Sequence, residues 1–359
     1  MTIDRLVLMA VALLLCASTG SALRITDAGE PVAQIVTPAE PTATEQFAAE
    51  ELQSYLRQIS GATLTIATEP DAAEGPRLLI GRTQAGLALP VEGDETEAFI
   101  VLCAGDDLIL RGAGDRGTLY AVYDFLEQDL GCRWLGPGPL WESIPSAGTI
   151  DIGALDRTES PDMRYRYLRM TYDNETREPF ADCLSWAGKQ RINIGAGWPQ
   201  EELPESFVKR GGFRAWMAPH VIQHALDPDV YFEEHPEWYA LRGGERVKMP
   251  KAGTQQVCTT NPDVVEAVAA KLGEMFDARP EVDFMGLGQG DGTAFCECEA
   301  CTALDTGEIW PYQDKQLPVI TERWLSFCNA VARKLQVTHP GKKIYTLAYH
   351  QTFRPPDPA

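Results

Sequence analysis

Short apolar runs in the second half of the chain place the strongest constraint on its fold. Each run ends in glycine or in a polar, ionisable residue, and amphipathic helices separate the last three. Strands that alternate with helices indicate parallel βα units. Polar residues at the carboxyl ends of successive strands are typical of a (β/α)8 barrel. The runs are YRYLRM (165–170), INIGAG (192–197), FRAWMAPH (213–220), DFMGLG (283–288) and KIYTLAYH (343–350).

The alternative is an open doubly wound sheet, but no glycine-rich phosphate loop follows any run, which disfavours its nucleotide-binding form. Two helices are predicted between the later runs, one after the N-cap Asn261 and one over residues 319–335. A complete barrel needs about 250 residues, whereas residues 165–359 provide 195. We therefore predict a partial TIM-type (β/α)8 barrel over residues 160–359, with about five βα units, in a truncated sequence.

The first part of the chain has a different pattern. An extended strand is expected over residues 24–37, followed by a helix that Thr44 caps and Gly61 ends. RLLIG (77–81) predicts a buried strand, and EAFIVLCAGDDLILRG (97–112) predicts a hairpin. A second helix ends at Gly131. Two helices against a small sheet predict an α+β domain over residues 23–150.

The first 22 residues have the pattern of a secretory signal peptide. The apolar run Leu6–Leu15 is too short to span a bilayer, and small residues end at Ala22. Cys16 offers a lipoprotein alternative, but no small residue directly precedes it. We expect a secreted or periplasmic protein without a membrane span.

The chain is strongly acidic, with 31 basic and 52 acidic residues and a formal charge of −21. Phosphate binding needs clustered lysine and arginine, so this balance argues against nucleic acid as a partner. The acidity itself is typical of a soluble exported protein and does not identify a substrate.

Residues 112–138 have the sequence GAGDRGTLYAVYDFLEQDLGCRWLGPG. They resemble the N-terminal domain of the glycoside hydrolase family 67 α-glucuronidases, an accessory α+β domain that also occurs beside family 20 hexosaminidase barrels. The likeness rests on Arg116-Gly117, the Tyr-Ala-Val-Tyr run and residues 131–134.

The second half resembles a family of secreted bacterial proteins known as domain of unknown function 4838. The resemblance implies a glycosidase-like barrel behind an accessory domain and supplies no substrate. It rests on YFEEHPEWYALRGGERV (231–247), QVCTTNPDVVEAV (256–268), GQGDGTAFCECEAC (288–301) and YTLAYHQTFRPP (345–356).

Asp291 is the candidate catalytic residue. It lies among glycines directly after the fourth predicted strand, where barrel active sites are found. Family 20 enzymes have an Asp-Glu pair here, in which the aspartate orients the acetamido group and the glutamate acts as the acid. Gly292 replaces that glutamate, which disfavours family 20 chemistry. Asp-Gly also caps turns, so a structural role is the alternative.

Other candidates for substrate binding follow predicted strands or lie near them. His220 and His224 follow the third strand, with Trp238 and Tyr239 nearby, and aromatic rings beside imidazoles suit a carbohydrate cleft. Metal binding by the two histidines is disfavoured because Pro228 and the apolar Val-Ile-Gln indicate an irregular turn.

Arg169 at the end of the first strand and His350 at the end of the fifth are weaker candidates. Such an arginine could bind a uronate in bidentate fashion or form a structural ion pair.

Four cysteines form the other notable motif. Cys296, Cys298 and Cys301 have the spacing C-x-C-x2-C, and Cys258 precedes them. Four thiolates would satisfy a tetrahedral zinc ion or an iron–sulfur cluster. Export favours a disulfide instead, Cys298–Cys301 or Cys258–Cys296. Both alternatives are structural, and the sequence leaves them open.

These features predict a secreted glycoside hydrolase that cleaves O-glycosyl bonds in a polysaccharide or oligosaccharide, with uronic-acid-bearing and N-acetylated glycans as candidates. No cofactor is required, and the four cysteines could hold a structural zinc ion. The alternatives are a catalytically silent carbohydrate-binding barrel and a structural surface protein.

Overall fold

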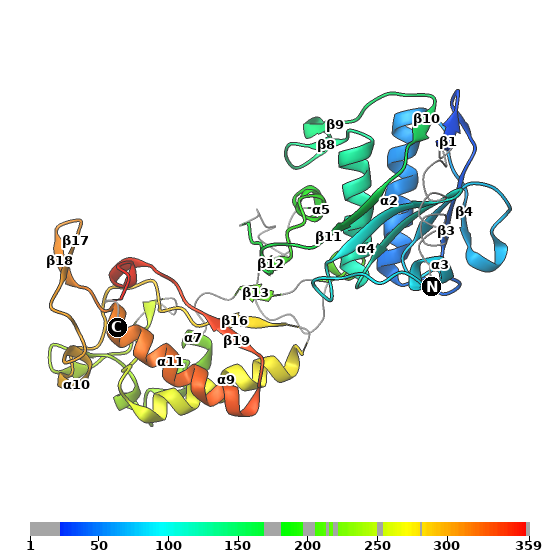
Figure 1. The fold of residues 1–359 in the computed structure, drawn as a ribbon. Helices are drawn as coiled ribbons and strands as arrows, with labels where there is room; N and C mark the ends of the chain where they lie inside the picture. The colour runs from blue at the N-terminus through cyan, green and yellow to red at the C-terminus, as the bar shows by residue number, and fades with distance from the viewer. Residues whose placement is uncertain are drawn as a thin grey trace, which may run out of the picture. The chain divides into compact units, whose positions relative to one another are not determined.

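The computed structural model describes residues 22–168, 181–196, 205–212, 215–217, 222–249, 254–280 and 282–356. They divide into two compact units (Figure 1). Unit 1 contains the described residues up to Arg166 and those within 179–192 and 203–212. Unit 2 contains those within 167–178, 193–202 and 213–359.

Unit 1 is built on a six-stranded mixed sheet with the order β11-β6-β7-β5-β3-β4. Its helices α2 and α4 pack side by side over the main apolar core (Figure 1). The strands are β3 (Gln34–Thr37), β4 (Ile66–Thr68), β5 (Arg77–Ile80), β6 (Phe99–Ala104), β7 (Asp107–Gly112) and β11 (Asp156–Glu159), and the helices are α2 (Ala43–Ser60) and α4 (Asp115–Asp124).

A capping box starts helix α2. The Thr42 hydroxyl accepts a hydrogen bond from the Glu45 amide, and the Glu45 carboxylate accepts one from the Thr42 amide. Thr44 was predicted as the cap and is instead buried inside the first turn, because Thr42 and Glu45 supply the reciprocal pair. Gly61 ends the helix at φ 83°, as predicted.

Other expectations for unit 1 are confirmed or corrected locally. The 97–112 hairpin is confirmed, since β6 and β7 pair antiparallel. The single strand over 24–37 is wrong, because Ala28 and Gly29 both adopt positive φ and turn the chain. That segment forms three strands, β1 (Leu23–Asp27), β2 (Glu30–Pro31) and β3. The second helix is α4, continued by the π-turn η2 (Phe125–Asp129) before Gly131.

Unit 2 contains a parallel sheet with the order β12-β13-β16-β19. Helices α9 and α11 pack against each other and share its apolar core (Figure 1). The strands are β12 (Ile194–Ala196), β13 (Ala215–Met217), β16 (Phe284–Gly286) and β19 (Lys343–Tyr345), and the helices are α9 (Pro262–Ala278) and α11 (Thr321–Thr338).

The prediction of parallel βα units is confirmed, as is the N-cap Asn261 of α9. The strands follow each other in chain order, without the reversal that defines a doubly wound sheet. Within the described residues, β12 and β19 remain sheet edges, so a closed barrel is not shown. Residues 165–168 of the first predicted strand are not extended into a strand, and residues 169–170 lie outside the described chain.

The remaining elements are short. Unit 1 also contains β8 (Arg133–Trp134), β9 (Glu142–Ser143), β10 (Ile150–Ile152), η1 (Glu69–Asp71), α3 (Gln84–Leu87), η3 (Pro139–Trp141), α5 (Ala181–Lys189) and α6 (Glu205–Val208). Unit 2 also contains α7 (Ile222–Ala225), α8 (Pro228–Tyr231), η4 (Pro236–Trp238), β14 (Leu241–Arg242), β15 (Glu245–Arg246), α10 (Glu299–Thr302), β17 (Ile309–Tyr312), β18 (Lys315–Pro318) and η6 (His350–Thr352).

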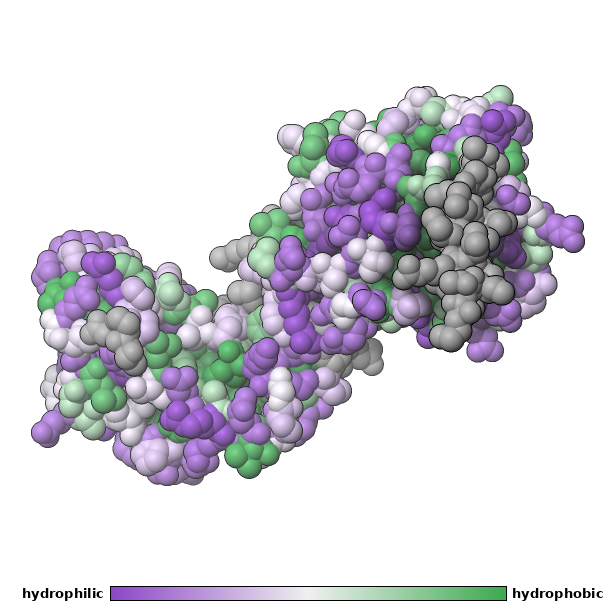
Figure 2. All heavy atoms as spheres, viewed as in Figure 1, coloured by the Kyte–Doolittle hydropathy of each residue, from purple (hydrophilic) through white to green (hydrophobic). Residues whose placement is uncertain are grey.

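Hydrophilic residues predominate on the face shown in Figure 2, where hydrophobic ones form small separate groups. Among the helices that the structure describes, none combines the length and the apolar character needed to cross a bilayer.

Candidate functional site

Asp291 lies just beyond the carboxyl end of strand β16. Residues 284–290 are buried, and Asp291 is the first exposed residue after them. The Leu287 amide donates to the Tyr345 carbonyl and continues the pairing between β16 and β19. Since these strands are parallel, the residues that follow each of them meet at the same edge of the sheet. That edge is where Asp291 and the segment 349–353 come together.

Two buried glutamines hold the Asp291 loop. The side-chain amide of Gln256 donates hydrogen bonds to the carbonyls of Gly290 and Gly292, at 2.9 and 3.1 Å. It therefore holds the backbone on both sides of Asp291. Gln289 donates to the Tyr349 carbonyl at 2.9 Å and to the Thr352 hydroxyl at 3.0 Å. The loop is therefore fixed both to the segment before α9 and to the segment after β19.

Tyr349 lies close enough to Asp291 to be affected by its charge. Burial is the largest cause that raises the pKa of the Tyr349 hydroxyl. The negative charge of Asp291 raises this pKa further, and the electrostatic effect of Tyr312 acts in the same direction. The shift favours the protonated phenol, which is a hydrogen-bond donor.

Aromatic rings gather beside this edge and form what we call the aromatic cluster: Trp310, Tyr312, Tyr349, His350 and Phe353. Trp310 and Tyr312 are two residues apart on β17, which puts them on one face of the strand. Ring centroids lie 4.8 Å apart for Trp310–Tyr312 and 5.3 Å apart for Tyr312–His350. Tyr349 and Phe353 remain 40% and 39% exposed. Such partly exposed rings can stack on a sugar.

The sequence analysis expected His350 to end the fifth strand, but it does not. β19 stops at Tyr345, and His350 begins η6 with a left-handed φ of 52°. This backbone conformation is uncommon outside glycine. It accompanies contacts of the imidazole with the rings of Trp310 and Tyr312 from the β17–β18 hairpin.

Sequence reasoning missed Trp310, Tyr312, Tyr349 and Phe353. The available signal was the Trp-x-Tyr spacing in EIWPYQDKQLP (308–318), which places two aromatic rings on one strand face.

The other predicted sugar-binding residues are not brought to this edge by any described contact. Tyr239 is fully buried, and its hydroxyl donates to the carbonyls of Leu226 and Asp227. Its ring is therefore part of the core. Trp238 is partly buried and stacks on His235, with ring centroids 4.1 Å apart. Arg169 and His220 lie outside the described residues, and for His224 only its place in helix α7 is described.

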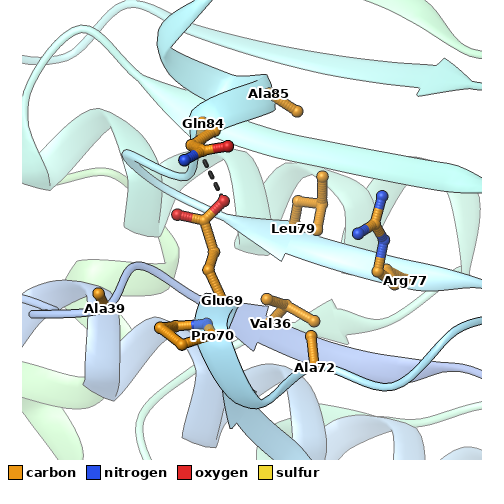
Figure 3. A pocket seen from close by; sticks show the side chains of 9 residues that line it. All are labelled: Val36, Ala39, Glu69, Pro70, Ala72, Arg77, Leu79, Gln84 and Ala85. Carbon is orange, nitrogen blue, oxygen red and sulfur yellow. Dashed lines mark hydrogen bonds between the residues drawn. The ribbon is translucent and has the colours of Figure 1, made fainter.

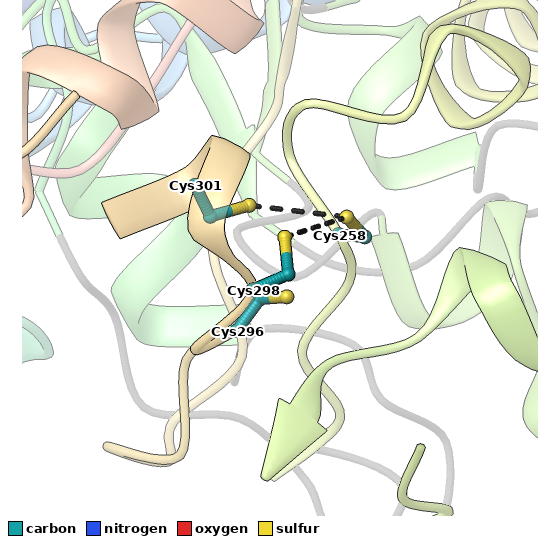
Figure 4. A group of neighbouring side chains, drawn as sticks. All are labelled: Cys258, Cys296, Cys298 and Cys301. Atoms are coloured by element: carbon teal, nitrogen blue, oxygen red, sulfur yellow. Dashed lines mark hydrogen bonds between the residues drawn. The ribbon is translucent and has the colours of Figure 1, made fainter. Parts of the chain in front are cut away.

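The four cysteines of the motif come together. Figure 4 shows the sulfurs of Cys258, Cys296, Cys298 and Cys301 pointing toward one another from two segments. All four sulfurs lie within 4.8 Å of one another, and three of the residues are buried. The eight cysteines among the described residues are all free. The cluster has the donor set of a metal site.

A separate hollow lies in unit 1 and is a weaker candidate. It has a volume of about 370 Å³ and is lined by Val36, Leu79, Glu69, Arg77 and their neighbours (Figure 3). Its charged groups are already engaged. Glu69 accepts a hydrogen bond from the Gln84 amide, and Arg77 pairs with Asp107. Little polar capacity remains there to orient a ligand.

Comparison with solved structures finds glycoside hydrolases. A family GH115 4-O-methyl-α-glucuronidase with specificity for decorated arabinogalactans aligns at 13% identity and a TM-score of 0.50, over 93% of this chain and 43% of the enzyme. The N-acetyl-β-hexosaminidase of Streptomyces plicatus aligns at 14% identity and a TM-score of 0.47, over 90% of this chain and 62% of that one. The chain thus spans less than two thirds of these proteins, and at such identities the likeness concerns the fold alone.

No curated protein matches the chain. A family match covers residues 137–359 and carries the description Domain of unknown function (DUF4838). The match begins at residue 137 and includes only the last two of residues 112–138, so the likeness of that segment to an α-glucuronidase N-terminal domain remains a prediction. Because the matched region is more than half of the sequence, the chain belongs to the DUF4838 family.

Proposed function

We propose that this protein acts on carbohydrate as a glycoside hydrolase, with Asp291 facing a sugar that the aromatic cluster binds. The observation that carries the proposal is the position of Asp291 directly after β16, at the carboxyl edge of the parallel sheet, where the neighbouring Gln289 binds Tyr349 and Thr352. The fold-level likeness to the GH115 α-glucuronidase supports it. Export through the predicted signal peptide over residues 1–22 would bring the protein to extracellular glycans.

Each part of the site has a chemical role in this proposal. The aromatic faces of Trp310 and Tyr312 would stack on the apolar face of a sugar ring. The Asp291 carboxylate would accept hydrogen bonds from sugar hydroxyls or take part in proton transfer. The Gln256 amide keeps the carboxylate in place by fixing the carbonyls on both sides of it. A site held this way is organised before substrate binds.

Carbohydrate binding without turnover is the second candidate function. Glycoside hydrolysis generally uses two carboxyl groups, and Gly292 directly follows Asp291. A Cβ atom at position 292 would lie 3.1 Å from the Thr254 carbonyl oxygen. An Asp-Glu pair therefore does not fit here without a shift of the Thr254 backbone. This observation favours either a different partner for Asp291 or a binding role.

Reducing-sugar release from uronic-acid-bearing and N-acetylated glycans tests the proposal, with glycan binding measured in parallel. The wild-type chain is compared with Asp291→Asn and with Asp106→Asn, a matched control at the exposed β6–β7 turn. Release that only Asp291→Asn abolishes supports hydrolysis at this site. Release that survives Asp291→Asn excludes Asp291 as a catalytic group. Binding without release, in a folded protein, supports the second function.

A further inference from the structure

The cysteine cluster joins two segments that are distant in sequence. Cys258 lies in the loop before α9, whereas Cys296, Cys298 and Cys301 lie at the start of α10, about forty residues later. The surrounding apolar core is small and separate from the main core of unit 2. It contains Ala240 and the three buried cysteines, with Leu241, Val247 and Cys298 packed against them. Among the described residues this local core is small, and small cores in natural proteins are often supplemented by cross-links or metals.

The sulfurs are close enough together to share one ion. The Cys258 sulfur lies 3.7 Å from that of Cys298 and 3.8 Å from that of Cys301. Four thiolates at about 2.3 Å from a central zinc ion are about 3.8 Å from one another. The two separations from Cys258 therefore match the edges of a zinc tetrathiolate, and the other sulfurs lie within 4.8 Å of one another.

Hydrogen-bond donors surround the sulfurs. The Leu241 amide donates to the Cys296 sulfur at 3.4 Å, and the Arg246 guanidinium donates to it at 3.8 Å. The hydroxyls of Thr260 and Thr259 lie 3.2 and 3.5 Å from the Cys301 sulfur. Four thiolates around one zinc ion carry a net negative charge, and such outer donors stabilise it. A positive Arg246 and these N–H and O–H groups suit thiolates better than neutral thiols.

From this geometry we infer that Cys258, Cys296, Cys298 and Cys301 bind one zinc ion as a structural site. Four protein ligands leave no open position for a substrate or water, which distinguishes this site from a catalytic zinc. Thiolates select zinc or iron over harder cations, and a redox-inactive zinc ion suits a purely structural role. Binding displaces four thiol protons and fastens the start of α10 to the loop before α9.

The test begins with the full chain purified without chelators or added metal. Elemental analysis is expected to find one zinc ion per chain. The four clustered cysteines are expected to resist alkylation until a strong chelator is added, whereas alkylation of Cys103, Cys132 and Cys183 in unit 1 should not depend on the chelator. Disulfide-linked peptides joining these cysteines, without bound zinc, overturn the inference. Stoichiometric iron, or a metal-free chain with four freely alkylated thiols, overturns it too.

Variants locate the site. Cys298→Ser removes one of the four thiolate ligands while keeping its approximate size, and it is expected to be purified without the zinc ion. Cys103→Ser, in unit 1 and outside the cluster, is the matched control and should retain the metal. Equal zinc content in both variants contradicts the assignment. Alkylation of the wild type decides the question even if Cys298→Ser does not fold. The outcome is independent of the proposed glycosidase activity.

Discussion

At the scale of single residues, the site depends on how the backbone around Asp291 is held. An exposed carboxylate in a glycine-rich loop has many conformations available, and ordering it costs conformational entropy. Gln256 reduces that freedom because one buried amide binds the carbonyls before and after Asp291. Gln256 is also two residues from Cys258, and Asp291 is five residues from Cys296. The candidate sugar site and the cysteine cluster therefore share their supporting segments.

The aromatic cluster makes the first prediction at this scale. Replacing Trp310 with alanine removes the largest ring that could stack on a sugar and should weaken glycan binding by about 1–2 kcal/mol, roughly 5- to 30-fold. Affinity gel electrophoresis or calorimetry on the glycan selected by the activity screen measures this. Trp141→Ala is the matched control, since Trp141 is an exposed tryptophan of unit 1. Equal losses in both variants would show that Trp310 has no specific role.

At the scale of elements, Glu45 connects helix α2 to the strand beside it. Its carboxylate accepts hydrogen bonds from the Thr42 amide, the Arg82 amide and the Arg82 guanidinium. Burial pushes the pKa of Glu45 up, but the hydrogen bonds and charge of Arg82 and the Thr42 amide outweigh it, so the pKa lies below its usual value. Gly81 is required here, because any side chain would collide with the Glu45 carboxylate.

The second prediction concerns Glu45→Gln. A lowered folded-state pKa means that the ionised carboxylate stabilises the fold above its unfolded pKa of about 4.3, and that this contribution is lost as the pH falls through the folded value. Glu45→Gln should cost about 1–2 kcal/mol of unfolding free energy at pH 7, and the difference should shrink below pH 4.

Urea unfolding followed by circular dichroism measures this difference in unfolding free energy. Glu50→Gln, exposed on the same helix, should change little. A pH-independent difference for Glu45→Gln would contradict the linkage.

Elements with complete local signals could be predicted from the sequence. Asn261 followed by Pro262 and an apolar stripe predicts α9 correctly because capping and periodicity act within one segment. The β17–β18 hairpin lacked such a signal. Its two-residue turn places Gln313 at φ 54°, where asparagine or glycine is usual. The contact of Trp310 with His350 joins residues forty positions apart, which no local pattern reveals.

At the scale of the whole molecule, each unit has its own core. Helices α2 and α4 cover the core of unit 1, and α9 and α11 contribute to that of unit 2. Units with separate cores can unfold separately. The cysteine cluster belongs to unit 2 alone. A ligand that binds only the folded form of one unit stabilises that unit and not the other.

The last prediction follows from this separation and rests on the inferred zinc site. Removing zinc with a chelator withdraws binding free energy from the folded form of unit 2 and should lower its thermal midpoint by roughly 10 °C. Unit 1 should keep its midpoint, since its described core shares no residue with the cluster. Calorimetry resolves the two transitions, and hydrogen exchange of peptides from α2 and α9 assigns them.

Chelator added to Cys298→Ser, which already lacks the metal, should cause no further change. Because Gln256 and Asp291 flank the cluster in sequence, loss of zinc should also increase exchange in residues 288–296. Equal shifts of both transitions would mean that the chelator acts on the chain generally, and an unchanged unit 2 would show that its fold does not depend on zinc.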